Sequence, residues 1–341
     1  MRSPLNKRLF RELRGEFGKY LVIFILMTLT IGMVSGFLVA DGSMIQAYEE
    51  SFEKYSIENG HFRTEKKMNN AQIQDIEDLG IKLYENYYVE EALTNGSTMR
   101  IFKNRDEVNK VCLMKGKMPE KPGEIGIDRM YADNNDLSVG DEIESGGHTW
   151  KITGLVALSD YSALFSNNND SMFDSVKFGV SVVCPEEFDS YKADQLNYSY
   201  AWKYNTEPKN EKAEKDISED LMEDVAKEVT LEEFVPRYTN QAIIFTGDDM
   251  GGDRSMMIVL LYIIIVIMAF VFAITTSNTI RKEANVIGTL RASGYTRGEL
   301  IRHYMAAPVF VTFIGAIIGN VIGYTVGKDY CAGLYYGSYS L

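Results

Sequence analysis

Three long apolar segments constrain this chain more than any other feature of its sequence. They cover residues 20–40, 256–279 and 304–327. Each has about the 20 residues that a helix needs to cross a hydrocarbon layer of roughly 30 Å. Lipid offers no partner to an open backbone hydrogen-bonding group, so a spanning helix is the expected conformation. The sequence therefore predicts a membrane protein with three transmembrane helices, and long core helices of a soluble protein are the alternative.

Charge is distributed unevenly around these segments. Residues 1–19 and 280–303 are short and carry an excess of Lys and Arg, whereas residues 41–254 hold 43 Asp or Glu against 23 Lys or Arg. Short cytoplasmic loops of membrane proteins are enriched in Lys and Arg. The pattern predicts that the N-terminus and residues 280–303 are cytoplasmic, and that residues 41–254 and the tail 328–341 are extracytoplasmic.

The N-terminal region offers two further predictions. Residues 1–19 place leucine or phenylalanine every four residues among cations, a pattern typical of an amphipathic helix on a membrane surface (Leu5, Leu9, Leu13 and Phe17). The first apolar segment is longer than the core of a signal peptide and ends in a poor cleavage site. We therefore expect an uncleaved anchor, continued outward by a helical stalk over residues 41–57.

The extracytoplasmic region between the first two spans is predicted to be a mixed α/β domain. Segments rich in β-branched and aromatic residues predict strands at 81–89, 98–102, 124–127, 149–155 and 176–183. Helices are predicted at 70–79 and 209–229, the second opening after Pro208. The strongly acidic surface either keeps this domain soluble or attracts a cationic ligand such as a peptide.

Side chains that carry chemistry are sparse and scattered. His61, His148 and His303 lie far apart, and no Cys/His pair has the spacing of a zinc site. The chain contains no G-x-x-x-x-G-K-[ST] phosphate loop, no H-E-x-x-H and no G-x-S-x-G. We predict no catalytic residue, no metal site, no nucleic-acid partner and no ATP hydrolysis by this chain alone.

The three cysteines do not define a disulfide framework. Cys112 and Cys184 each follow an apolar pattern typical of a strand, and they either pair or remain buried free thiols. The residue pattern favours free thiols, and Cys331 is left over in both cases.

Small residues recur every four positions in two of the apolar segments. Such stripes let a second helix approach closely and pack by van der Waals contact. Tight helix packing is predicted here, with a partner helix from this chain or from a second copy. The residues are Gly315, Gly319, Gly323 and Gly327 in the third segment, and Gly32, Gly36 and Ala40 in the first.

The short cytoplasmic segment 280–303 carries the most specific motif. Its run IGTLRASG, at residues 287–294, resembles the E-I-G-x-L-R-A-x-G signature of FtsX-like (MacB-like) permeases of ABC transporters. The resemblance implies a coupling element that contacts an ATP-binding subunit, formed by Gly288, Leu290, Arg291, Ala292 and Gly294. The family's glutamate falls on Val286, and Glu283 is the nearest candidate for its role.

Motifs of the outer region agree with this resemblance. The segments MKGKMP with GEIGI, at residues 114–127, and LSVGD, at residues 137–141, are similar to segments of the family's outer domain. The order of span, outer domain, span, coupling loop and span is similar to the family's over nearly the whole chain. The family core has four spans, so the resemblance suggests a truncated chain or a split gene.

The resemblance implies a bacterial cell-membrane permease subunit that couples ATP hydrolysis in a partner to movement of its outer domain. ATP and Mg²⁺ would belong to that partner, and no cofactor is expected in this chain. Other implied partners are lipid, a second permease copy or C-terminal half, and a cationic peptide or a wall or periplasmic protein. Peptide or lipoprotein export, antimicrobial peptide resistance and wall signalling all remain open. The alternatives are a peptide-sensing receptor without transport, a membrane-anchored external enzyme and a non-functional truncated permease.

Overall fold

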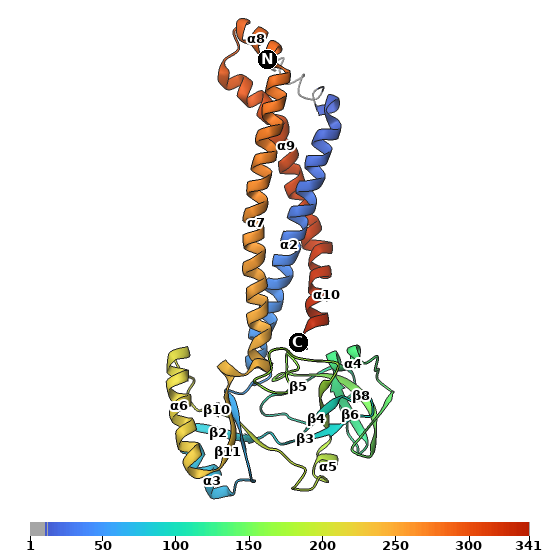
Figure 1. The fold of residues 1–341 in the computed structure, drawn as a ribbon, viewed down its shortest axis with the longest axis vertical. Helices are drawn as coiled ribbons and strands as arrows, with labels where there is room; N and C mark the ends of the chain where they lie inside the picture. The colour runs from blue at the N-terminus through green and yellow to red at the C-terminus, as the bar shows by residue number, and fades with distance from the viewer. Residues whose placement is uncertain (1–10, 12, 341) are drawn as a thin grey trace. The chain divides into compact units, whose positions relative to one another are not determined.

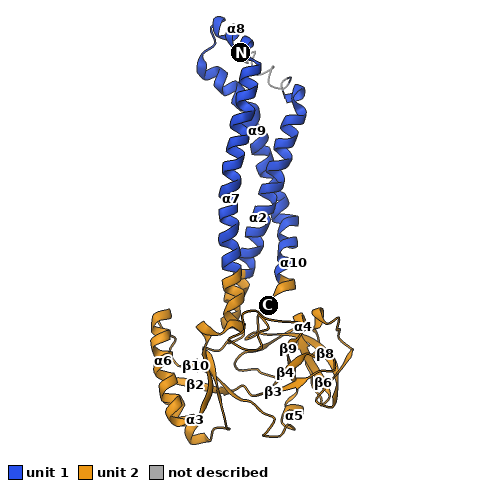
Figure 2. Ribbon diagram, in the orientation of Figure 1, with its two compact units in different colours: residues 1–44, 250–335 blue, residues 45–249, 336–341 orange. Residues whose placement is uncertain are grey.

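The computed structural model describes residue 11 and residues 13–340 (Figure 1). Most of the helix predicted at residues 1–19 therefore lies outside the described residues. The chain divides into two compact units, shown in different colours in Figure 2. Residues 1–44 and 250–335 form the helical unit, and residues 45–249 and 336–341 form the α/β unit.

Long apolar helices make up the helical unit. Within the described residues, three helices are long and apolar enough to cross a membrane: Phe17–Lys54 (α2), Gln241–Lys282 (α7) and the run Arg297–Ser338. That last run consists of α9 (Arg297–Ile322), a π-helical turn η2 (Gly323–Gly327) and α10 (Lys328–Ser338). Many large apolar side chains on these helices are exposed, which is what a lipid-facing surface requires. The predicted membrane boundaries within the helices stay predictions.

Two β-sheets with peripheral helices form the α/β unit: the smaller is antiparallel, and the larger is mixed. One sheet has four strands in the order β11-β1-β10-β2, and the other has seven, in the order β3-β4-β9-β6-β8-β5 with β7 paired to β8. The strands are β1 (Gly60–Thr64), β2 (Ile81–Glu85), β3 (Tyr88–Ala92), β4 (Thr98–Lys103), β5 (Val111–Gly116), β6 (Glu124–Asp128), β7 (Glu142–Ser145), β8 (His148–Leu158), β9 (Phe178–Val183), β10 (Tyr198–Tyr204) and β11 (Leu231–Pro236). The helices are α3 (Asn70–Glu77), α4 (Arg129–Asn134), α5 (Pro185–Phe188), α6 (Glu211–Glu228) and the 3-10 turn η1 (Arg237–Thr239).

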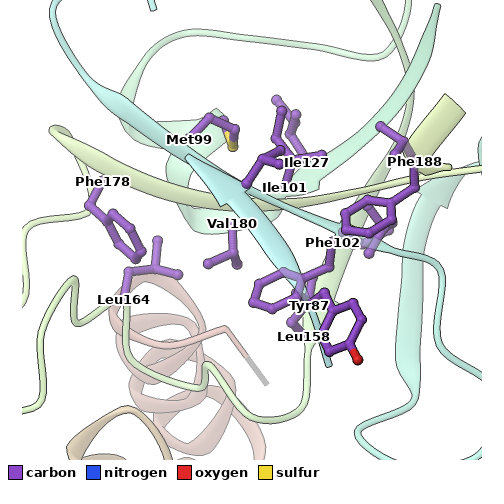
Figure 3. Close-up of a cluster of buried hydrophobic side chains, with 14 of the residues drawn as sticks. Tyr87, Met99, Ile101, Phe102, Ile127, Leu158, Leu164, Phe178, Val180 and Phe188 are labelled. Atoms are coloured by element: carbon purple, nitrogen blue, oxygen red, sulfur yellow. The ribbon is translucent and has the colours of Figure 1, made fainter. Parts of the chain in front are cut away.

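Most core residues of the α/β unit come from the larger sheet and from the helices α4 and α5, and others come from the smaller sheet. Strand β9 is buried along its whole length and lies in the interior of the larger sheet, between β4 and β6. Figure 3 shows part of this core, including Met99, Ile101, Ile127, Phe178 and Val180. The chain's two tryptophans, Trp150 and Trp202, are fully buried in this unit. Tryptophan fluorescence therefore reports on the α/β unit alone.

This architecture confirms the predicted fold class of apolar helices plus a mixed α/β domain. Besides shifts of a few residues at other element ends, two differences from the predictions stand out. The strand predicted at 81–89 is split at residues 86–87, because β2 pairs with β10 in one sheet while β3 pairs with β4 in the other. Helix α7 begins at Gln241, fifteen residues before the second apolar segment. Its first turns are glycine-rich and acidic, a composition that favours a loop in isolation.

The cysteines are free in the structure. Cys112 lies half-buried on β5, and Cys184 is buried directly after β9. Cys331 is buried in α10. The preference for free thiols over a pair of Cys112 and Cys184 agrees with this arrangement.

Candidate coupling site

A break in the helix separates α7 from the predicted coupling element. The backbone of Glu283 leaves helical geometry at φ −101° and ψ 14°, and α8 (Ala284–Ala292) begins at the next residue. The Tyr304 hydroxyl donates a hydrogen bond of 2.7 Å to the Glu283 carboxylate. Tyr304 lies in α9, so this bond fixes the α7–α8 junction against α9.

Gly294 ends α8 in a well-defined way. Its φ of +97° is accessible at no steric cost only to glycine. The Gly294 amide donates to the carbonyl of Arg291 at 3.1 Å, and the Tyr295 amide donates to the carbonyl of Leu290 at 3.2 Å. These two bonds make a Schellman motif, which satisfies the last carbonyls of the helix. The backbone conformation at the end of α8 therefore requires glycine at position 294, independently of any coupling role that the motif implies.

Helix α9 starts immediately afterwards with a capping box. The Thr296 side chain accepts from the Glu299 amide, and the Glu299 carboxylate accepts from the Thr296 amide at 2.9 Å. Reciprocal caps of this kind fix where a helix begins. Residues 283–299, which we call the elbow, thus comprise α8, a turn and the first residues of α9. The caps on both sides fix the geometry of the turn.

The elbow presents its side chains to solvent. No residue of α8 is buried, and Gly288, Arg291, Ala292 and Gly294 are all exposed. Leu290 is half-buried, and Arg291 lies in the last turn of the helix, where a cation is favoured by the helix dipole. The structure brings the predicted coupling residues together on one exposed, capped element. Glu283 stands apart from the others because its carboxylate is engaged by Tyr304.

A polar cluster that the sequence did not predict joins the start of α2 to the end of α7. The Lys19 ammonium donates to Thr279 Oγ1 at 2.6 Å and to Glu16 at 3.0 Å, and Lys282 lies 3.5 Å from the same Glu16 carboxylate. The charge distribution in the sequence predicted that Lys19 and Lys282 are cytoplasmic, but it predicted no contact between their segments. A contact over 260 residues leaves no local signal in a sequence.

The two glycine stripes meet within this chain. A Cβ on Gly36 would lie 2.7 Å from the carbonyl carbon of Gly327, and a Cβ on Gly323 would lie 2.6 Å from the oxygen of Gly32. Gly319 lies against the backbone of Thr28 with an equally short approach of 2.8 Å. Gly315 and Ala40, the outer members of the stripes, are buried as well. The partner helix left open by the sequence is therefore a helix of the same chain, α2 against α9 and η2.

The α/β unit contains a polar cavity of about 200 Å³ lined by residues of both sheets. Its charged groups are paired with one another: Glu58 with His61 at 2.6 Å, and Arg100 with Glu90 at 2.6 Å. Asp160, also in the lining, accepts two bonds of 2.7 Å from Arg105. These pairs stabilise the cavity wall.

The histidines do not assemble into a metal or catalytic site. His148 stacks on Trp150, and His303 is buried in α9. Among the described residues, no group of three or more His, Cys, Asp or Glu side chains has the arrangement of a metal site.

The pair of Glu58 and His61 predicts a pH dependence of stability. Burial alone would lower the pKa of His61, but the Glu58 carboxylate outweighs burial and raises that pKa. The stabilisation is therefore complete below the ordinary histidine pKa of about 6.5 and is lost as pH rises through the raised value. We expect the stability gap between the parent and His61→Gln to be widest near pH 6 and to narrow towards pH 9. Urea unfolding of the full chain in detergent, followed by tryptophan fluorescence, measures the gap, and a gap independent of pH contradicts the pairing.

Comparison with known proteins agrees with the motif in the elbow. Residues 258–339 match the family model described as FtsX-like permease C-terminal, and this match includes the elbow. The resemblance to FtsX-like permeases is thereby confirmed for this part of the chain. No curated protein matches the chain.

Two solved structures are similar to the chain at low identity. One is the periplasmic region of MacB from Actinobacillus actinomycetemcomitans, at 11% identity and a TM-score of 0.29, covering 50% of this chain and 85% of that one. The other is the extracellular domain of the noncanonic ABC-type transporter YknZ from Gram-positive bacteria. It has 11% identity and a TM-score of 0.29, and the match covers 49% of this chain and 92% of that one. Likenesses this weak carry no argument of their own.

Proposed function

We propose that this chain is the permease subunit of an ABC transporter of the FtsX/MacB type. The observation that carries the proposal is the elbow: a capped, exposed helical turn between two apolar helices, within the segment that matches the FtsX-like permease model. An exposed turn of fixed geometry is suited to docking a second protein, because little conformational entropy is lost on binding. The partner in this proposal is an ATP-binding subunit that holds ATP and Mg²⁺.

Helix continuity supports a mechanical role. Helices α2 and α7 each include residues of both units, and α7 extends without interruption over 42 residues from Gln241 to Lys282 (Figure 2). At 1.5 Å per residue its length is about 63 Å. In the proposed mechanism, closure of the ATP-binding subunits displaces the elbow, and α7 carries the displacement to the α/β unit outside the membrane. The α/β unit then acts on a substrate or on a wall or periplasmic partner.

A second function, sensing without transport, is favoured by the polar cavity of the α/β unit. Polar and charged groups in a pocket fix the orientation of a bound ligand, and this cavity carries several of them. Sensing and transport differ in one respect: only a transporter needs an ATP-binding partner for its response. Dependence of the ligand response on that partner separates the two functions.

Charge reversal at the elbow tests the proposal. We expect Arg291→Glu to reduce co-purification of the ATP-binding subunit by about tenfold or more, since like charges across a docking surface cost several kcal/mol. The measurement is recovery of the partner with the tagged full chain from membranes in mild detergent. The matched control is Arg302→Glu, which reverses an exposed cation of α9 outside the motif. Equal recovery with parent and Arg291→Glu would overturn the assigned role of Arg291.

A further inference from the structure

The residues that follow α10 are buried in the α/β unit. Tyr339 is 4% exposed and Ser340 is 2% exposed, and both belong to this unit together with residues 45–249. The segment 336–340, which we call the tether, comprises the last turn of α10 and the two residues that follow it. The sequence offered no reason to expect a short polar tail to be buried.

Arg129 is the main contact of the tether. It is itself 4% exposed, and its Nη2 donates to the carbonyls of Tyr336 and Tyr339, at 2.6 Å in both cases. Its guanidinium carbon also lies 3.8 Å from the centroid of the Tyr336 ring. The last carbonyls of a helix lack intrahelical partners and carry the negative end of its dipole. Arg129 therefore caps the end of α10 from a different part of the chain.

Neighbouring groups hold the last described residue. The Ser340 hydroxyl donates to the Asp128 carboxylate at 2.6 Å, and the Ser340 amide donates to the Ser162 carbonyl at 3.0 Å. The Ser162 hydroxyl lies 3.1 Å from the carbonyl of Ala242, in the first turn of α7. The Tyr339 hydroxyl bonds to Asp249, also on α7. The tether thus contacts both α4 and the start of α7.

We propose that the surface formed by Asp128, Arg129 and Ser162 is a docking site for the tether, and that it holds the last turn of α10 within the α/β unit. Buried charges without partners are strongly unfavourable, so a buried Arg129 needs acceptors. Among the described residues, the hydrogen-bond partners of Arg129 outside the tether are limited to Asp133, an exposed residue of α4, and the neighbouring Asp128 carboxylate adds a second negative charge. The tether supplies two carbonyls that complete the site.

Through the docking site, the last turn of α10 is part of the α/β unit, as are the last turns of α2 and the first turns of α7. Part of this inference rests on the proposed function: in a working transporter, movement of α9 and α10 would reach α4 through Arg129. Fastening of the tether itself requires no ATP-binding partner.

Hydrogen–deuterium exchange of the full chain in detergent tests the docking site. In the parent, we expect the Ser340 amide to exchange at least tenfold more slowly than an unstructured chain. Arg129→Gln removes the charged donor of the hydrogen bonds to the carbonyls of Tyr336 and Tyr339. It should speed exchange of the Ser340 amide at least tenfold, while peptides from β8 and β9 remain protected. The matched control is Asp133→Ala, which removes the exposed partner of Arg129 but leaves both carbonyl contacts; a change below twofold is expected.

Two results would overturn the docking site. One is exchange of residues 336–340 in the parent at the rate of an unstructured chain, which needs no variant and is decisive even if Arg129→Gln does not fold. The other is an equal effect of Arg129→Gln and Asp133→Ala. The proposed transfer of movement from α10 to α4 is measured separately, in the complex with the ATP-binding subunit. We expect hydrogen exchange at residues 128–133 to change on nucleotide binding in the parent and not in Arg129→Gln. Failure to recover that subunit would count against the proposed function and leave the tether measurement intact.

Discussion

Gly36→Leu is expected to separate α2 from α9 and η2 and to destabilise the helical unit by about 3 kcal/mol or more. A Cβ at this position would lie 2.7 Å from the carbonyl carbon and 2.9 Å from the Cα of Gly327. Both are backbone atoms, so no rotamer change relieves the clash, and the two helices must move apart. Far-UV circular dichroism during titration of the purified chain with SDS measures the loss of stability.

Gly42→Leu is the matched control for that prediction. Gly42 lies on the same helix, and a Cβ there would meet no atom within 4 Å. Leucine has a higher helix propensity than glycine by nearly 1 kcal/mol, so this variant should be as stable as the parent or slightly more stable. Similar destabilisation by both substitutions would show that close packing at Gly36 is not the cause.

Asp160→Ala is expected to destabilise the α/β unit by about 3–5 kcal/mol. The Arg105 side chain is 7% exposed, and the Asp160 carboxylate accepts from both of its terminal nitrogens at 2.7 Å. Without Asp160, the guanidinium keeps one hydrogen bond among the described residues, of 2.9 Å to the neutral Asn86, and its contact with the Phe102 ring. A buried charge without a counter-charge is one of the costliest changes a folded protein can undergo. Urea unfolding followed by tryptophan fluorescence reports this unit because both tryptophans lie in it.

An exposed ion pair of the same unit provides the comparison. Lys103 lies 3.0 Å from Asp189, with side chains that are 44% and 63% exposed. Lys103→Ala should therefore cost about 1 kcal/mol or less. If Asp160→Ala costs no more than Lys103→Ala, the buried pair does not stabilise the unit as argued.

Elements with a strong local pattern were predictable, and those set by distant contacts were not. The apolar helices follow from uninterrupted runs of apolar residues, but the first turns of α7 contain Gly247, Gly251 and Gly252. Gly247 is needed because the ring of Tyr48 packs against it: a Cβ there would lie 2.5 Å from that ring. A glycine that permits close packing of two helices looks like a loop residue when only its neighbours in sequence are considered.

The same distinction holds for the candidate site. The coupling residues were identified from a contiguous motif, and the glycine stripes from their spacing. The bond of Tyr304 to Glu283 spans 21 residues, and that of Arg129 to Tyr336 spans 207. Neither pair has a local pattern that distinguishes it from ordinary surface residues. Long-range polar contacts of this kind depend on the fold, so they became visible only in the structure.

The most direct test of the central claim is a pull-down of the tagged full chain from native membranes in mild detergent, read by mass spectrometry. We predict that an ATP-binding protein is recovered in near-stoichiometric amount with the parent chain. Efficient recovery of the chain without any ATP-binding protein would contradict its assignment as the permease subunit of an ABC transporter.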